Sequence, residues 1–208
     1  RIKRDQYGNI EKRKVRLVAM GNTSVKGVTH DWTHAPGASP VSMRALVALA
    51  CKLRKVISSY DLEQCYLQAP INQPSAKDIF LYPPRELIFR DKMGRPMVFK
   101  CTSNLYGLAS GGADSFAHVD KHMITEQGLV ASRGDPCLYA YRAEGWTPHS
   151  LGANHGQFLF HSLYTDDGIY FGSPEAEKSF ESKLNAGFNV RINSVCKFIL
   201  GMRLEQLQ

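Results

Sequence analysis

Apolar residues recur at the spacing of an amphipathic helix in residues 39–55 and 113–127, and start signals predict a third helical segment from Ser173. Two of these segments begin with Ser-Pro, at Ser39-Pro40 and Ser173-Pro174, which supplies an N-cap hydroxyl and a proline at the first helical position. Gly128 follows the remaining segment as a stop signal. The predicted helices span residues 39–55, 113–127 and 173–187.

Shorter runs rich in aromatic and β-branched residues predict strands between and around these helices. The clearest runs are residues 158–164 and 169–171, which flank a turn and form a predicted hairpin. Helices stacked on one face of a mainly antiparallel sheet would give an α+β architecture. The other predicted strands lie in residues 1–19 (a hairpin), 56–62, 79–82, 97–101, 137–141 and 188–204, the last with two strands around Asn193-Ser194.

The outgoing strand of the first hairpin is basic. Strand alternation places Lys14 and Arg16 on one face and Val15 and Leu17 on the other. The formal net charge is +7, and the first 16 residues hold seven Lys and Arg against two Asp and Glu. Such a stretch suits a polyanion, either nucleic acid or a nucleoside triphosphate, and the alternative is a solvated basic hairpin.

The turn of the central hairpin carries two adjacent carboxylates, Asp166 and Asp167. Asp and Gly are ordinary turn residues, so a solvated turn is one explanation. The other is a site for a hard divalent cation such as Mg²⁺, which takes carboxylate oxygens as ligands and would offset the repulsion between the two charges. The turn alone leaves both interpretations open.

The other candidate ligands favour structural roles. His118 and His122 have the four-residue spacing of helical metal ligands, but the Glu of HExxH is absent, and we expect two surface histidines. The five cysteines form no CxxC pair and predict reduced thiols of an intracellular protein, without disulfides or a zinc site. No apolar run reaches transmembrane length, there is no signal peptide, and a start at Arg1 without Met predicts a fragment of a longer protein.

Seven stretches, in order along nearly the whole chain, resemble the reverse transcriptase domain of copia-type LTR retrotransposons. Each short motif is weakly specific alone, whereas seven in register are highly specific. Residues 14–21 resemble KxRLVAxG, 27–36 GIDYDETFAP, 60–67 MDVKTAFL, 105–108 LYGL, 135–139 DPCLY, 164–167 YVDD and 198–202 YFLGI.

The resemblance implies a fingers–palm fold without a thumb and RNA-directed DNA polymerisation by two Mg²⁺ ions, with Mn²⁺ as an alternative. The fingers would comprise about residues 1–38 and 72–110, and the palm about 39–71 and 111–208. The implied metal ligands and catalytic residues are Asp61, Asp166 and Asp167.

The resemblance also implies binding roles around the three carboxylates. Lys14 and Arg16 would neutralise the incoming triphosphate, and Tyr66 would stack under the sugar and exclude a 2′-hydroxyl. The implied nucleotide-binding residues are Lys14, Arg16, Gln64, Cys65, Tyr66, Tyr106 and Gly107, and the implied primer grip is Leu200, Gly201 and Met202.

The implied partners are an RNA or DNA template–primer, deoxynucleoside triphosphates and the rest of a polyprotein, with its thumb, RNase H and integrase. No membrane partner is expected. The implied location is intracellular, in a cytoplasmic virus-like particle with a nuclear stage.

One segment departs from the family pattern. After LYGL the family usually has KQ(A/S)PRxW, whereas residues 109–115 are ASGGADS, with an added acidic residue at Asp114. The alternative function is therefore a catalytically decayed or domesticated nucleic-acid-binding or assembly module that keeps the fold. An RNA-binding domain of the RRM type ranks last, because its aromatic pattern for base stacking is absent.

Overall fold

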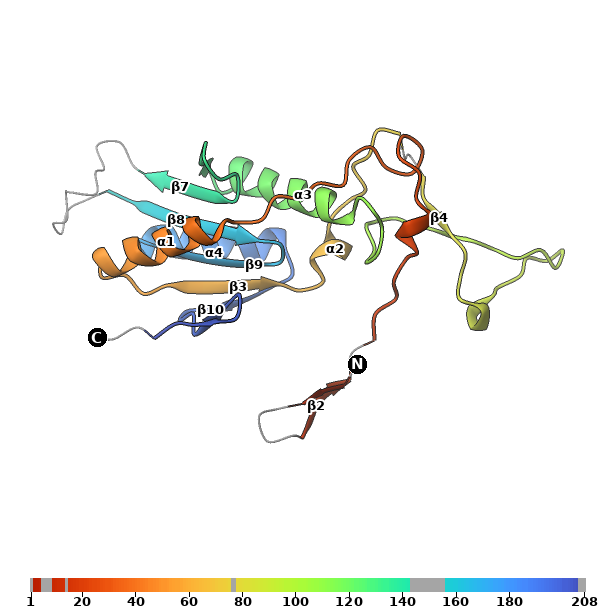
Figure 1. The fold of residues 1–208 in the computed structure, drawn as a ribbon, viewed down its shortest axis with the longest axis horizontal. Helices are drawn as coiled ribbons and strands as arrows, with labels where there is room; N and C mark the ends of the chain where they lie inside the picture. The colour runs from red at the N-terminus through yellow and green to blue at the C-terminus, as the bar shows by residue number, and fades with distance from the viewer. Residues whose placement is uncertain (1, 5–8, 14, 76–77, 143–155, 206–208) are drawn as a thin grey trace.

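A six-stranded antiparallel sheet forms the centre of the structure (Figure 1). The computed structural model describes residues 2–4, 9–13, 15–75, 78–142 and 156–205. The strand order β10-β3-β9-β8-β7-β6 and the antiparallel pairing confirm the mainly antiparallel α+β prediction. The strands are β3 (Ser58–Leu62), β6 (Val130–Ala131), β7 (Leu138–Arg142), β8 (Phe158–Tyr164), β9 (Asp167–Gly172) and β10 (Val190–Asn193).

Two helices, α3 (Gly111–Thr125) and α4 (Pro174–Gly187), pack on the same face of this sheet. Phe180 of α4 lies 4.8 Å from the ring of Tyr170, and the hydroxyl of Tyr139 donates a 2.7 Å hydrogen bond to Asp120 of α3. Tyr139 and Tyr170 project from β7 and β9 on the same side, so their partners mark the side that the two helices cover.

Helix α1 (Pro40–Lys52) covers the opposite face, as Figure 1 shows. Gly37, just before α1, lies against Tyr164, since a Cβ at Gly37 would be 3.5 Å from that ring. Strand alternation puts Tyr164 on the side of β8 opposite to His161. The expectation that the helices cover one face therefore holds for α3 and α4 and is wrong for α1.

The serines of the two Ser-Pro dipeptides make different contacts at the starts of their helices. The Ser39 hydroxyl accepts a 3.0 Å hydrogen bond from the amide of Ser42, which confirms the predicted N-cap of α1. Ser173 makes no capping bond, although Pro174 occupies the first turn of α4 as predicted. The Ser173 hydroxyl instead accepts a 3.4 Å bond from the amide of Phe158 and so ties the helix to β8.

The N-terminal hairpin is present but shorter than predicted. Strands β1 (Ile2–Arg4) and β2 (Ile10–Arg13) pair antiparallel, whereas residues 15–20 form no strand. The predicted continuation through Ala19 is therefore wrong, because this segment pairs with a distant turn: the amide of Ala19 donates a 2.7 Å hydrogen bond to the carbonyl of Tyr106. Lys14 lies outside the described residues.

An extension leaves the sheet and helices between α2 (Cys65–Gln68) and α3 (Figure 1). The predicted strand pair in this region is confirmed, since β4 (Phe80–Leu81) pairs antiparallel with β5 (Phe99–Lys100). Two short 3-10 helices, η1 (Gly21–Thr23) and η2 (Arg85–Leu87), complete the irregular part of the chain.

The C-terminal part contains three strands where two were predicted. Strand β10 pairs with β3, and β11 (Phe198–Ile199) pairs with β12 (Met202–Arg203) across a tight turn. Leu200 and Gly201 both have positive φ values, 49° and 77°, which close this turn. The first predicted strand is β10, which pairs with β3, and the second is divided into β11 and β12.

Side-chain environments agree only partly with the sequence. His118 and His122 are half-buried and meet the ring of Phe188 edge-on, at centroid distances of 5.3 and 4.8 Å, so the expectation of two surface histidines is wrong. The five cysteines are free thiols, and Cys65 is among the buried ones. Within the described ranges, no helix combines the length and the apolar character needed to cross a membrane.

Candidate functional site

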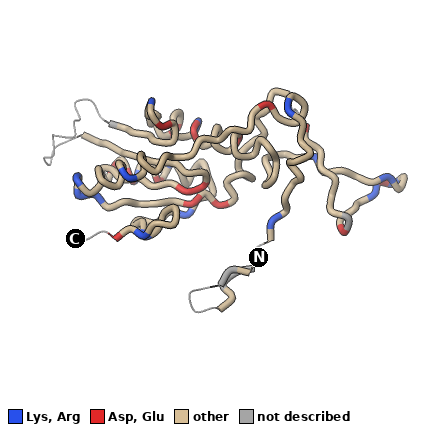
Figure 2. The backbone as a smooth tube through the Cα atoms, in the orientation of Figure 1, with Lys and Arg blue, Asp and Glu red and all other residues tan. Residues whose placement is uncertain are grey.

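The three carboxylates singled out in the sequence meet at one end of the sheet. Asp61 of β3 and Asp167 of β9 are direct cross-strand partners, and Asp166 precedes Asp167 in the hairpin turn. The amide of Leu62 donates a 2.8 Å hydrogen bond to the carbonyl of Asp166, which ties the turn to β3. Figure 2 shows acidic positions together where β3 and the β8–β9 hairpin end.

The pKa of Asp167 reflects how close the three carboxylates are to one another. Burial raises the pKa of Asp167 to about 6, and the negative charges of Asp166 and Asp61 act in the same direction. Asp166 also contributes to the raised pKa of Tyr66, whose main cause is burial. Asp167 therefore takes up a proton at a higher pH than an ordinary aspartate when no cation offsets the neighbouring charges.

The donor set suits a hard divalent cation. Carboxylate oxygens are the protein ligands that Mg²⁺ prefers, and a cation beside Asp167 would reverse the effect of its two acidic neighbours on its pKa. In the described part of the chain, however, no group of three or more His, Cys, Asp and Glu side chains is already arranged to hold an ion. The chemistry of the site fits the implied ions, while the ligand arrangement itself is not preformed among these side chains.

The segment that follows β3 places Gln64 and Cys65 beside the carboxylates. Gln64 has a left-handed backbone (φ 57°) and is the N-cap residue of the short helix α2. The Cys65 sulfur lies 2.9 Å from the hydroxyl of Ser115 in α3 and 4.0 Å from the carbonyl of Thr165 in the hairpin turn. The amides at the start of α2 are thus held between α3 and the acidic turn.

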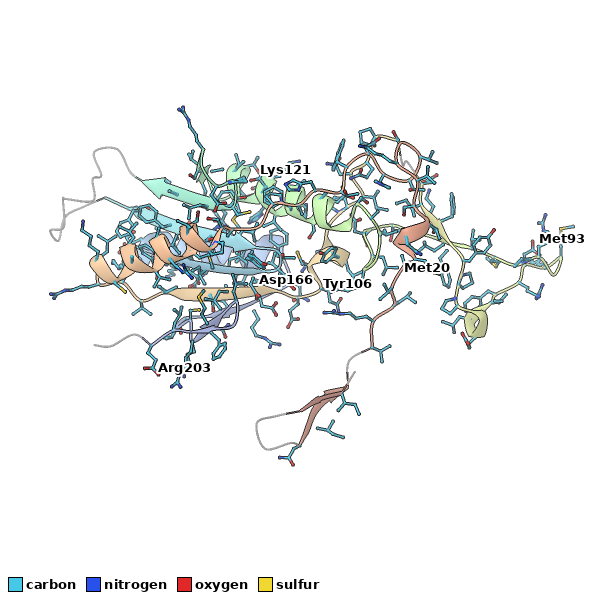
Figure 3. The ribbon with its side chains drawn as sticks, viewed as in Figure 1. Met20, Met93, Tyr106, Lys121, Asp166 and Arg203 are labelled. Carbon is cyan, nitrogen blue, oxygen red and sulfur yellow. The ribbon has the colours of Figure 1, made fainter. Side chains whose placement is uncertain are left out.

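A line of contacts runs from Tyr66 of α2 through Tyr106 to Arg16. The rings of Tyr66 and Tyr106 have centroids 5.3 Å apart, and the Arg16 guanidinium lies 4.8 Å from the centroid of Tyr106. Tyr66 also abuts the start of α3, since a Cβ at Gly111 would be 3.0 Å from its ring. In Figure 3, the labelled Asp166 and Tyr106 both lie near α2.

Gly107 has a backbone role that the sequence did not predict. Its φ of 87° is in the left-handed region, and a Cβ there would lie 2.2 Å from the carbonyl oxygen of Ala19. A Cβ at Gly21 would come even closer to the carbonyl oxygen of Gly107, so both glycines permit the crossing of two chain segments.

The predicted primer-grip residues also lie near the carboxylates. Leu200, Gly201 and Met202 form the turn between β11 and β12 and the start of β12. Leu200 lines a pocket of about 160 Å³ together with Asp61 and Asp167. The structure therefore brings this turn to the acidic end of the sheet, although the chain separates it widely from Asp61.

A buried polar network, which the sequence did not predict, holds the altered segment. Asp114 is 1% exposed and accepts hydrogen bonds from Gln73 Nε2 at 2.6 Å and from Asn104 Nδ2 at 3.1 Å. Gln73 in turn accepts bonds from the amides of Asp31 and Trp32. The added acidic residue thus serves the fold, and the only local signal for it was an acid in the first turn of a helix.

One protein family matches the chain over its whole length. A model of the family described as "Reverse transcriptase (RNA-dependent DNA polymerase)" matches residues 1–208, so the chain belongs to the reverse transcriptases. By family it is an RNA-directed DNA polymerase. No solved structure matches the chain.

The chain is similar to segments of several transposon polyproteins. The retrovirus-related Pol polyprotein from transposon TNT 1-94 of Nicotiana tabacum is 23% identical over 98% of this chain. The Transposon Ty1-ER2 Gag-Pol polyprotein of Saccharomyces cerevisiae is 28% identical over 92%, and the transposon RE1 polyprotein of Arabidopsis thaliana is 22% identical over 96%. These matches confirm the resemblance to copia-type elements. The chain covers only 14%, 10% and 12% of the lengths of these relatives, so it resembles one segment of each longer polyprotein.

Proposed function

We propose that this chain is the fingers–palm core of a copia-type reverse transcriptase that transfers nucleotides from deoxynucleoside triphosphates to a primer 3′-hydroxyl. The observation that carries the proposal is the cross-strand pair Asp61–Asp167 with Asp166 beside it, in a chain of this family. The fingers would be about residues 1–38 and 72–110, and the palm about 39–71 and 111–208.

The three carboxylates would hold two divalent ions, Mg²⁺ or Mn²⁺. Bound ions would supply positive charge that activates the primer hydroxyl and stabilises the in-line transition state. The protein's own contribution would be rigidity: two of the carboxylates lie on paired strands, and the Leu62–Asp166 hydrogen bond fixes the turn. Such fixed positioning is most of what phosphoryl transfer asks of a protein.

The neighbouring residues would bind the nucleotide and the primer. Lys14 and Arg16 would face the triphosphate, and the amides of Gln64 and Cys65 would support it. The Tyr66 ring, held by Tyr106 and Gly111, would lie under the sugar and exclude a 2′-hydroxyl. The nucleotide and template pocket would be lined by Tyr106 and Gly107, and the primer end would be held by Leu200, Gly201 and Met202.

The alternative is a non-catalytic nucleic-acid-binding or assembly module. The segment 109–115 favours it, because this segment lacks the family's basic residues and directs Asp114 into a buried network. In either case the chain would act with template–primer and with the thumb, RNase H and integrase of its polyprotein, in cytoplasmic particles. Intact carboxylates at all three positions favour the enzyme.

Primer extension tests the proposal. An oligo-dT primer on an rA template is incubated with Mg²⁺ or Mn²⁺ and the parent protein, with Asp166→Asn beside it. Asp78→Asn, an exposed residue that pairs with Lys100, is the matched control. We expect extension by the parent and by the control, and none by Asp166→Asn. Salt-sensitive binding without extension by any of them would favour the binding module, and equal extension by Asp166→Asn would exclude the assigned site.

A further inference from the structure

Tyr60 and Gly168 form the rung of the sheet next to the acidic pair. Tyr60 of β3 lies directly opposite Gly168 of β9, and Asp61 lies opposite Asp167 one position further along. Because successive side chains of a strand point to opposite faces, the Tyr60 ring projects away from the carboxylates and toward Phe180 of α4. A bulky side chain and a glycine thus share the rung that adjoins the proposed metal ligands.

The Tyr60 ring fills the space that any side chain at residue 168 would need. A Cβ at Gly168 would lie 2.3 Å from Cζ, 2.4 Å from Cε1 and 2.6 Å from the hydroxyl oxygen of Tyr60. These distances are far below van der Waals contact, so the ring or the backbone of β9 would have to move. Gly168 has no positive φ, so packing and not backbone conformation requires a glycine here.

The ring has little freedom to move, because it is held on its other sides. The Tyr60 hydroxyl is hydrogen-bonded to Nε2 of His161 at 2.8 Å, and the two rings stack with centroids 5.6 Å apart. The exposed fractions of Tyr60 and His161 are 1% and 0%. Burial raises the pKa of Tyr60 and lowers the pKa of His161 to about 3, so both side chains stay neutral at physiological pH.

We propose that Tyr60 and Gly168 are a size-matched pair that lets β3 and β9 pair without distortion beside the carboxylates and thereby positions Asp61 against Asp167. Tyr60 is a positioning residue in this proposal, and His161 holds its ring in place. The pair is not replaceable one residue at a time: a larger residue at 168 requires a smaller one at 60. The positioning role rests on the proposed function of the two carboxylates, whereas the size match does not.

A double-mutant cycle in denaturant unfolding tests the size match without any activity. Gly168→Ala should unfold at a lower urea concentration than the parent, and Tyr60→Met/Gly168→Ala should recover much of that loss, because methionine is slimmer and flexible. Tyr60→Phe/Gly168→Ala keeps the ring and should show no recovery. Gly134→Ala is the matched control, since the nearest atom to its Cβ would be 4.0 Å away. Parent-like stability of Gly168→Ala, or no recovery with methionine, would overturn the size match.

Metal response and kinetics test the positioning role. We expect Gly168→Ala to lower kcat about 100-fold, as for a small displacement of reacting groups, and to raise the Mg²⁺ concentration for half-maximal extension, with both restored by Tyr60→Met. The upward shift in unfolding midpoint caused by Mn²⁺ should be lost in Gly168→Ala and regained in the double variant. Recovery of stability without recovery of the Mn²⁺ shift would overturn the positioning role. A parent without polymerase activity would contradict only the proposed function, since the unfolding cycle and the Mn²⁺ shift still decide the pair.

Discussion

The buried carboxylate of Asp114 accepts a 2.6 Å hydrogen bond from Gln73, a residue far from it in the chain. Gln73 also accepts bonds from the amides of Asp31 and Trp32, so one amide side chain joins α3 to the loop before α1. The segment that departs most from its family is therefore built around a buried network in which both Asp114 oxygens are paired, whereas Asn104 Oδ1 has no partner among the described residues. Such networks stabilise a fold only when their members are paired.

Removing the Asp114 carboxylate should destabilise the protein. Asp114→Ala leaves the Gln73 amide group without its acceptor and removes one acceptor of Asn104 Nδ2, which keeps the carbonyl of Pro70, and we expect a loss of about 2 kcal/mol in the free energy of unfolding. Urea unfolding measures it. Asp78→Ala, which removes an exposed ion pair with Lys100, should change stability by less than about 0.5 kcal/mol. Equal stabilities of the two variants would show that the network is dispensable.

The raised pKa of Asp167 predicts a pH-dependent stability of the metal-free protein. Its pKa is about 6 in the folded state against an ordinary 3.8, so folding favours the protonated acid. This stabilisation is complete below about pH 4 and is lost as the pH rises through about 6. Asp167→Asn should therefore exceed the parent in stability near pH 7, by about 1 kcal/mol for a half-exposed group. Unfolding midpoints in EDTA across this range test it, and parallel pH profiles would contradict it.

Shortening Tyr66 should relax sugar selection. Tyr66→Val removes the ring that Tyr106 and Gly111 hold, so a ribonucleotide's 2′-hydroxyl would fit, and we expect discrimination against ribonucleotides to fall at least about tenfold. Single-nucleotide incorporation with matched deoxy and ribo substrates measures it. Tyr82→Val, at an 85% exposed tyrosine, is the control. Unchanged discrimination would remove Tyr66 from the gate role.

Loss of Arg16 should weaken nucleotide binding more than it slows the chemical step. Arg16→Ala removes a guanidinium that sits over Tyr106 and would face the triphosphate, so we expect the KM for deoxynucleotides to rise about tenfold. Arg16→Lys keeps the charge, so its KM should lie between those of the parent and of Arg16→Ala. Arg95→Ala, which removes only an exposed pair with Asp91, should leave KM unchanged. A fall in kcat at constant KM would contradict this role.

Local signals in the sequence located most regular elements. Helices α1 and α4 lie where predicted, because the dipeptides Ser39-Pro40 and Ser173-Pro174 are local start signals. The central hairpin also lies where predicted, because turn residues separate 158–164 from 169–171. Residues 15–20 alternate like a strand but lack a strand partner, because Ala19 pairs with Tyr106. Alternation shows that a segment could form a strand, whereas pairing decides whether it does.

The residues of the site could be predicted from the sequence, but the contacts of the side chains around it could not. The resemblance selected Asp61, Asp166 and Asp167, and the structure brings them to one end of the sheet. Contacts between side chains that are far apart in the chain leave no local pattern in the sequence. The half-burial of His118 depends on Phe188, and the burial of Asp114 depends on Gln73. Neither contact follows from helical periodicity.

The position of β3 between β9 and β10 bears on the order in which a growing chain can fold. During synthesis, β3 leaves the ribosome long before either neighbour exists, so both its edges stay unpaired until residues 167–193 have been made. Pairings between such distant segments form slowly and leave strand edges open to other chains. A nascent chain from which β9 has emerged and β10 has not would therefore have one open edge on its acid-bearing strand. We expect chaperone binding to concentrate on that intermediate.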